Sequence, residues 1–128
     1  MQETTKIFVY GTLKHNCCNH HITRQIKAKY ISKVKTKDFY PLYPSQYYFP
    51  YLEDQEGIGK IVIGELYEVP TTKMSILDEF EGVPDLYKKG LIDLVDEEGK
   101  EFLGVSVYFK SKDTFCLHRE LIDEWKEE

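Results

Sequence analysis

The sequence predicts one compact domain of the α+β or all-β class, built on a small, partly closed sheet or barrel with helices at its ends. Three observations support this prediction. The chain has 128 residues, 41% of them hydrophobic and 14% aromatic, which suits a single hydrophobic core. Strand-like segments outnumber helical segments, and a short helical pattern lies between strands. No repeat or linker rich in Pro, Gly or Ser divides the chain, so we expect one domain over residues 1–128.

The first half of the chain predicts a strand, a short helix, a second strand and an irregular excursion. Residues 6–10 are β-branched and aromatic, and the strand that they predict breaks into a loop at a glycine. Asn19 is placed to cap a short helix over residues 19–27, and residues 27–37 alternate like a strand. Residues 38–57 hold three prolines among many aromatic side chains. Proline lacks the donor that a central strand needs, so we expect this segment to pass over the core.

The second half predicts a strand, a short helix and a hairpin. Residues 60–70 form a strong strand pattern. Residues 71–82 form a helical pattern, with one of the two opening threonines as cap and the closing glycine as stop. Residues 91–109 read as a hairpin turned at Glu98-Gly99. The tail predicts an amphipathic helix whose apolar side carries Leu117, Leu121, Ile122 and Trp125.

The charge balance excludes some classes of function. The formal net charge is -5, so the chain has no broad positive field for phosphate backbones, and we expect no nucleic-acid partner. Within residues 24–37, basic residues alternate with apolar ones, which is typical of strands with one face exposed to solvent. No apolar run is long enough to span a membrane, and the first residues lack a signal pattern, so we expect a soluble, cytoplasmic protein without a membrane partner. The chain has three cysteines, two of them the adjacent Cys17 and Cys18, which cannot form a regular set of internal disulfides. This fits a reducing compartment.

The stretch "LDEFEG" at the end of the second predicted helix offers a candidate catalytic carboxylate. At about 100° per residue, Glu81 falls between Met74 and Leu77 on the apolar side of this helix, whereas Glu79 falls on the opposite face. Asp78 borders the apolar side. Partial burial would raise the pKa of the Glu81 carboxyl toward the range useful for proton transfer. The alternative is that Glu81, next to a glycine, curls back to solvent.

Glu65 is a second candidate that could point inward. Strand alternation places it on the same face as Ile63, Tyr67 and Val69. The alternatives are a charge on an edge strand or a carboxylate that is hydrogen-bonded to a neighbouring tyrosine.

The stretch "VYGTL" at the end of the first predicted strand offers a candidate anion site. Gly11 tolerates unusual backbone angles and has no side chain to block close approach, so successive N–H groups could face one space. Such an arrangement suits a carboxylate or a developing oxyanion. The alternative is an ordinary turn at the end of a strand.

The cluster "HNCCNHH" contains ligand types that suit zinc but not their usual spacing. Cys17-Cys18 and His20-His21 are adjacent pairs, so both members of a pair cannot readily reach one tetrahedral ion, and we expect no metal site. No cysteine is tied by sequence to a particular His and Asp, so a cysteine nucleophile is also disfavoured.

Taken in order, several motifs resemble the γ-glutamylcyclotransferase-like superfamily, and most closely its γ-glutamylamine cyclotransferase branch. The resemblance extends from Ile7 to Leu94. Its motifs are "FVYGTLK", Asn19-His20, "YPLY", "FPYL", "IGELYEV" and "ILDEFEGVPDLY".

This resemblance implies an α+β fold, a small mixed β-barrel with flanking short helices, whose open end holds a γ-glutamyl group. It implies that Tyr10, Gly11, Thr12 and Leu13 bind the glutamyl moiety through the backbone and that Glu81 is the catalytic acid/base. It requires no metal and no organic cofactor. Members commonly carry Arg-Gly after the loop lysine, whereas this chain has His15 and Asn16, which puts a substrate contact from the Arg position in doubt.

The implied reaction is intramolecular. The α-amine of a small γ-glutamyl substrate attacks its own γ-carbonyl, which gives 5-oxoproline and a free amine. The leaving amine and the oligomeric state stay open, and the alternative function is a non-catalytic small-molecule binding module on the same barrel. Tyr40, Tyr43 and Tyr51 are candidates to wall the pocket, with packing in the core as their alternative role.

Overall fold

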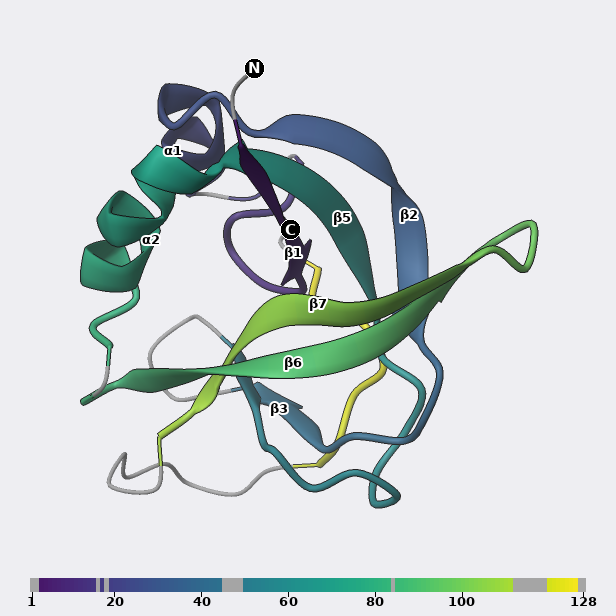
Figure 1. Cartoon of the computed structure of the whole chain (residues 1–128). Coiled ribbons are helices and arrows are strands. Elements are labelled where there is room, and N and C mark those ends of the chain that lie inside the picture. The colour runs from purple at the N-terminus through teal and green to yellow at the C-terminus, as the bar shows by residue number, and fades with distance from the viewer. Residues whose placement is uncertain are drawn as a thin grey trace.

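The computed structural model describes residues 3–15, 17, 19–44, 50–83, 85–111 and 120–126 (Figure 1). In chain order the elements are β1 (Thr4–Val9), α1 (His20–Gln25), β2 (Lys29–Thr36), β3 (Leu42–Pro44), β4 (Pro50–Leu52), β5 (Ile63–Pro70), a 3₁₀ turn (Thr71–Lys73), α2 (Met74–Phe80), β6 (Tyr87–Asp96) and β7 (Glu101–Lys110). No helix in the described part of the chain is long and apolar enough to cross a membrane.

Five strands form a closed barrel in the order β1-β5-β2-β6-β7. Neighbouring strands are antiparallel, except where β7 meets β1 in a parallel contact that pairs Ile7 with Ser106 and closes the barrel. The predicted small mixed β-barrel with flanking short helices is therefore confirmed. The β6–β7 hairpin turns at Gly99, as predicted, with a left-handed φ of 89° that glycine adopts without strain.

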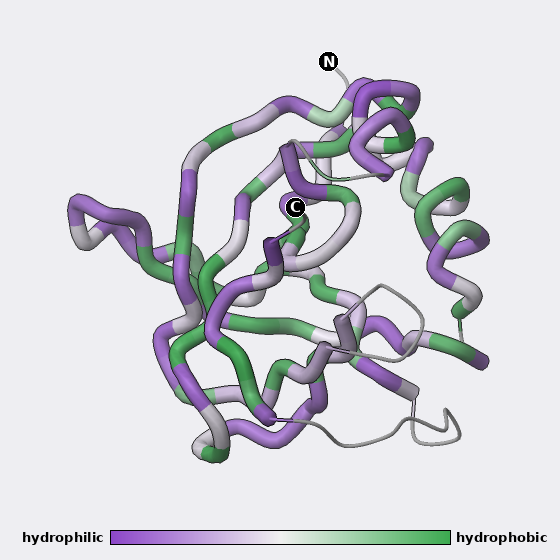
Figure 2. The backbone as a smooth tube through the Cα atoms, turned by 180° about the vertical axis from the view of Figure 1, so that it is seen from behind, coloured by the Kyte–Doolittle hydropathy of each residue, from purple (hydrophilic) through white to green (hydrophobic). Residues whose placement is uncertain are grey.

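The strand alternation divides the core into two clusters. Phe8 on β1 joins a cluster with residues from all five barrel strands, so this cluster fills the barrel. Ile7 and Val9, which point to the other face of β1, join a second cluster with Met74 and Leu77 of α2. The second cluster therefore fastens the helices to the barrel wall. Figure 2 shows the resulting alternation of hydrophobic and hydrophilic residues along the strands.

Both helices lie on the same side of the barrel (Figures 1 and 2). The expected threonine cap of the second helix is wrong, because a 3₁₀ turn precedes α2 and its N-cap is Lys73. Thr71 instead shares a hydrogen bond of 2.8 Å between its hydroxyl and that of Thr5 on β1. The expected glycine stop is present, since Gly82 follows the helix with a φ of 67°.

The proline-rich excursion contributes a small sheet of its own. Strands β3 and β4 pair with each other and lie outside the barrel ladder, and Leu42 and Leu52 in this pair are fully buried. Proline is the last residue of β3 and the first residue of β4, positions at which a missing N–H donor costs little stability.

The predicted C-terminal helix is wrong where the structure describes it. Residues 120–126 are not helical, and Ile122 instead forms an antiparallel bridge with Leu42 of β3. Leu117 lies outside the described residues. Pairing with a strand edge satisfies backbone groups that an isolated short helix would leave to water, so tertiary contact overrides the helical period.

Candidate active site

A pocket lies where the end of β1 and the following loop meet the end of α2. It is a small pocket, with a cavity volume of about 30 Å³. Its lining residues are Ile7, Phe8, Val9, Tyr10, Gly11, Thr12, Leu13, Pro50, Glu81, Tyr87 and Tyr108. The structure thus brings all five predicted site residues, Tyr10 to Leu13 and Glu81, to one pocket.

Glu81 reaches this pocket from the last turn of α2. It is the C-cap residue, and its N–H donates to the Leu77 carbonyl at 2.8 Å, so the helical geometry holds to this position. Met74 and Leu77 are buried and Glu79 is exposed, which is the distribution that the helical angles predict. The left-handed Gly82 then turns the chain away from the helix.

The environment of the Glu81 carboxyl combines burial with a lack of partners. Glu81 as a whole residue is partly exposed, but burial of the carboxyl group raises its pKa from 4.5 to about 7. Within the described residues, no hydrogen bond or ion pair reaches this carboxyl. Glu81 is therefore available to an incoming group and can exchange a proton near neutral pH.

Three tyrosines surround the carboxyl, and each hydroxyl has a partner elsewhere. The Tyr10 hydroxyl donates to the Tyr108 carbonyl, the Tyr87 hydroxyl donates to the Pro50 carbonyl at 2.8 Å, and the Tyr108 hydroxyl donates to Asp78 Oδ1 at 2.7 Å. Burial, and then the nearby Glu81 carboxylate, raise the pKa of Tyr10 well above its ordinary value. The pocket is thus walled by neutral phenols, which offer Glu81 no compensating positive charge.

The sequence did not single out Tyr87 and Tyr108 as pocket residues. The guess that Tyr40, Tyr43 and Tyr51 wall the pocket is wrong, since none of them lines it. Tyr40 and Tyr51 are packed in the two core clusters, which was the alternative role. Alternation along the last strand predicts which side of the sheet Tyr108 faces, but not that the end of α2 lies over it.

The loop after β1 is held by the segment that leads into α1. Lys14 N–H donates to the Gly11 carbonyl at 3.1 Å and closes a turn. The Asn19 N–H donates to the Thr12 carbonyl at 2.9 Å, and its side-chain amide donates to the Thr12 hydroxyl at 2.9 Å. Asn19 is the N-cap residue of α1, as expected, but its side chain bonds this loop and not its own helix.

These bonds leave donors free in the loop. In a trans peptide the carbonyl and the following N–H point in opposite directions. Since the Thr12 carbonyl faces Asn19, the N–H of Leu13 points away from α1. In the described part of the chain, the N–H groups of Gly11, Thr12 and Leu13 donate to no acceptor. Such a row of free donors beside a pocket suits an anion or a developing oxyanion.

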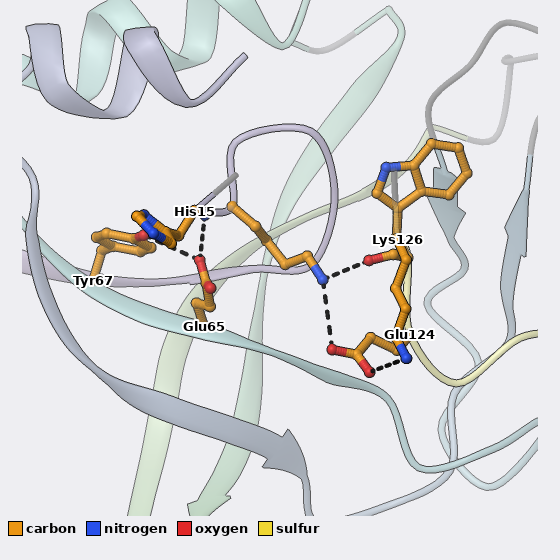
Figure 3. A network of polar contacts seen from close by, with 7 residues as sticks. His15, Glu65, Tyr67, Glu124 and Lys126 are labelled. Carbon is orange, nitrogen blue, oxygen red and sulfur yellow. Dashed lines mark hydrogen bonds and ion pairs between the residues drawn. The ribbon is translucent and has the colours of Figure 1, made fainter. Parts of the chain in front are cut away.

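Glu65 does not line this pocket. Its Oε1 accepts a hydrogen bond from the His15 N–H at 2.7 Å and another from the Tyr67 hydroxyl at 3.0 Å (Figure 3). The alternative interpretation, a carboxylate bonded to a neighbouring tyrosine, is therefore confirmed. The side chain of His15 packs edge-on against His20 outside the pocket, and Asn16 lies outside the described residues.

The His and Cys cluster gives no metal-binding arrangement in the residues that the structure describes, which include Cys17, His20 and His21 but not Cys18. His20 Nδ1 lies 2.9 Å from the Leu13 carbonyl, and the Thr23 hydroxyl donates to the same oxygen at 2.8 Å. These contacts support the loop that follows β1.

Comparison with known proteins places the chain in a family. The sequence model of the family described as "Gamma-glutamyl cyclotransferase, AIG2-like" matches residues 7–127. The chain belongs to this family. Among its relatives, gamma-glutamylaminecyclotransferase A of Danio rerio is 41% identical over 92 residues, which cover 69% of this chain and 57% of that protein. Gamma-glutamylaminecyclotransferase C of Danio rerio is 36% identical over 115 residues, which cover 84% of this chain and 76% of that protein.

Solved structures agree with this family membership. The crystal structure of an AIG2-like protein from Mus musculus matches with a TM-score of 0.80 and 28% identity, over 94% of this chain and 89% of that chain. The match to the first Danio rerio relative spans little more than half the length of that protein. The resemblance inferred from the motifs is confirmed, and so, at the level of the family, is the prediction of an enzyme of the γ-glutamyl cyclotransferase type.

Proposed function

We propose that this protein is a γ-glutamylamine or γ-glutamyl cyclotransferase that releases 5-oxoproline and a free amine. The observation that carries the proposal is the Glu81 carboxyl in the pocket that is also lined by Tyr10 to Leu13. This carboxyl is buried, has no partner among the described residues and has a pKa of about 7. A proton-transfer group beside a row of free N–H donors suits attack of an amine on a carbonyl.

In the proposed reaction, Glu81 removes a proton from the α-ammonium of the γ-glutamyl group. The neutral amine then attacks the γ-carbonyl carbon and forms the new C–N bond of a five-membered ring. The tetrahedral intermediate collapses, and Glu81 returns the proton to the leaving nitrogen as the original C–N bond breaks. The second proton of the ring nitrogen passes to the departing amine, which leaves as its ammonium. Protons balance within one turnover, so the reaction needs no co-reactant beyond the substrate.

The loop supplies the electrostatic part of this mechanism. As the amine attacks, negative charge develops on the γ-carbonyl oxygen, and the free N–H groups of Gly11, Thr12 and Leu13 are the donors available to stabilise it. A glycine also suits the packing at this point, because a Cβ on residue 11 would lie 3.0 Å from the Pro50 ring.

The burial of Glu81 serves the same purpose. An exposed glutamate is a weak base near neutral pH, whereas a carboxylate with a pKa near 7 accepts a proton from an ammonium more readily. The neutral tyrosines around it maintain this value, since an adjacent cation would lower it.

The test is release of 5-oxoproline from γ-glutamyl-ε-lysine and from γ-glutamyl-alanine by the full chain. Wild type should convert at least one of these substrates, and the two differ only in the leaving amine. Glu81→Gln keeps the shape of the side chain and removes the titrating group, so turnover should fall about 10³-fold.

Glu79→Gln is the matched control, because Glu79 lies on the same helix but is exposed outside the pocket. It should keep wild-type turnover. If neither substrate is converted but both protect the chain against thermal unfolding, the barrel is a binding module. Equal turnover by wild type and Glu81→Gln would remove Glu81 from the mechanism. Limited proteolysis that leaves residues 1–128 as one resistant unit would support the proposed single domain.

A further inference from the structure

We infer that Lys14 is a positioning residue through which the C-terminal segment, residues 122–126, sets the conformation of the Gly11–Leu13 loop. The inference rests on the proposed function, because the loop matters to turnover only if its N–H groups act on the substrate. Lys14 follows the last residue of the loop and does not line the pocket itself. It would therefore act through the backbone to which it is attached.

Lys14 is unusual because a lysine side chain is almost never buried unless it is paired. Only 6% of this residue is exposed. Its ammonium donates to the Trp125 carbonyl at 2.6 Å and lies 3.8 Å from Glu124 Oε2. Both partners belong to the C-terminal segment, more than 100 residues away in sequence. Burial of the charge thus depends on this segment being in place.

The C-terminal segment is fixed independently of Lys14. The Ile122 N–H donates to the Leu42 carbonyl at 2.9 Å, and the Asp123 carbonyl accepts from the Ile63 N–H at 2.7 Å. The segment is thereby bonded to β3 and to the start of β5 before it reaches Lys14. It can therefore act as an anchor for the loop.

The loop is tied down immediately after its free donors. The N–H of Lys14 closes the turn on Gly11, its ammonium is bound by the C-terminal segment, and the next N–H, that of His15, is bound by Glu65 (Figure 3). Because Lys14 is linked both to the turn and to the anchor, a change at its ammonium is transmitted to the turn. Loss of this link should loosen the Gly11–Leu13 N–H groups without touching the substrate.

The experiment compares Lys14→Met with Lys126→Met in the full chain. Methionine keeps a buried apolar stem of similar length at position 14 but removes the ammonium. Lys126 is the matched control, because it lies 3.7 Å from the same Glu124 carboxylate and is largely exposed (Figure 3). Amide hydrogen exchange of Lys14 and Asn19, whose N–H groups are bonded to the loop, and N–H chemical shifts of residues 11–13 are measured first, and kcat and KM second.

In Lys14→Met, the amides of Lys14 and Asn19, which are bonded to the Gly11 and Thr12 carbonyls, should exchange at least about tenfold faster, and the amides of residues 11–13 should shift, while those of β6 stay unchanged. The kcat should fall about tenfold with little change in KM, because the free donors act mainly in the transition state. Lys14→Arg should recover much of the wild-type amide exchange and of the wild-type kcat, and Lys126→Met should match wild type in both quantities. If Lys14→Met does not fold, Glu124→Gln should give smaller changes in the same direction.

Exchange and chemical shifts in the loop that match wild type in Lys14→Met or Glu124→Gln would overturn the inference, even if turnover changes. Exchange that rises equally in the loop and in β6 would also overturn it, since it would report general destabilisation. If wild type converts neither substrate, the proposed function fails, and the amide measurements still decide whether the C-terminal segment sets the loop.

Discussion

Two glutamates lie against the loop that follows β1, and their surroundings differ. Glu81 lines the pocket formed with Tyr10 to Leu13 and has no partner for its carboxyl among the described residues. Glu65 lies at the other end of the loop, where the His15 N–H and the Tyr67 hydroxyl donate to it. A carboxylate whose acceptors are occupied fixes the backbone, whereas one that is buried with free acceptors is available for a substrate.

The difference teaches that position on a face is not enough to assign a role. Both residues are predicted on the inner side of their elements, and both lie close to the same loop. The donors that reach Glu65, one from Tyr67 on its own strand and one from His15 in the loop, separate this structural carboxylate from Glu81, the proposed base.

Neutralising each glutamate in turn tests this comparison most strongly. Glu81→Gln should lower kcat for 5-oxoproline release by about 10³-fold, because the base is lost. Glu65→Gln should stay within about fivefold of wild type, because the amide oxygen still accepts both hydrogen bonds. Steady-state kinetics on purified variants measure both. A larger loss at Glu65 than at Glu81 would reverse the two assignments.

Narrowing the pocket beside the loop sharpens the comparison. In Gly11→Ala the new Cβ would meet the Pro50 ring at 3.0 Å, so the loop or the ring must shift by a few tenths of an ångström. A displacement of the free donors should lower kcat/KM by about 10- to 100-fold. The melting temperature should change little, because the position has no positive φ. Wild-type kcat/KM in this variant would argue against a role for the Gly11–Leu13 donors in turnover.

The pH dependence of stability distinguishes the buried carboxyl from a solvated one. The pKa of Glu81 is raised from 4.5 to about 7 on folding, so its contribution to stability is fully present below pH 4.5 and is lost as pH rises to about 7. Glu81→Gln does not titrate. It should therefore match wild type near pH 4 and exceed it by about 1–2 kcal/mol above pH 7, after allowance for the partial exposure of Glu81.

Urea unfolding at both pH values checks this prediction, with Glu79→Gln as control, which should follow wild type throughout. A Glu81→Gln stability gain that is equal at both pH values would show that the gain does not come from ionisation.

The smallest expected effect lies at Glu65. Tyr67→Phe removes one of the two donors to Glu65 and leaves the His15 N–H in place. The free energy of unfolding should therefore fall by about 1 kcal/mol, which corresponds to a fall of about 3–4 °C in melting temperature. Turnover should remain near wild type. Thermal unfolding and the release assay measure the two quantities, and a tenfold loss of turnover would give this second carboxylate a share in the chemistry.

Much of the fold and part of the site follow from local sequence patterns. The buried Met74 and Leu77 define a helical face, and this face directs Glu81 into the protein without any knowledge of the rest of the chain. The strands and the turn at Gly99 likewise follow from residue type and alternation. Local patterns succeed where one element's own burial decides the outcome.

The remainder depends on contacts between distant residues. Tyr87 and Tyr108 enter the pocket because β6 and β7 pass beneath α2, which alternation alone does not reveal. The predicted C-terminal helix failed because Ile122 pairs with Leu42, and the burial of Lys14 depends on the same docking. Long-range pairing of this kind has no local signal in the sequence.

The most direct measurement is an NMR titration of the Glu81 side-chain carboxyl carbon, assigned by its absence in Glu81→Gln. The structure predicts a midpoint near 7, because burial raises the pKa of this carboxyl. A midpoint near the ordinary 4.5 would mean that the carboxyl faces bulk water, and Glu81 would then have no special capacity as a base.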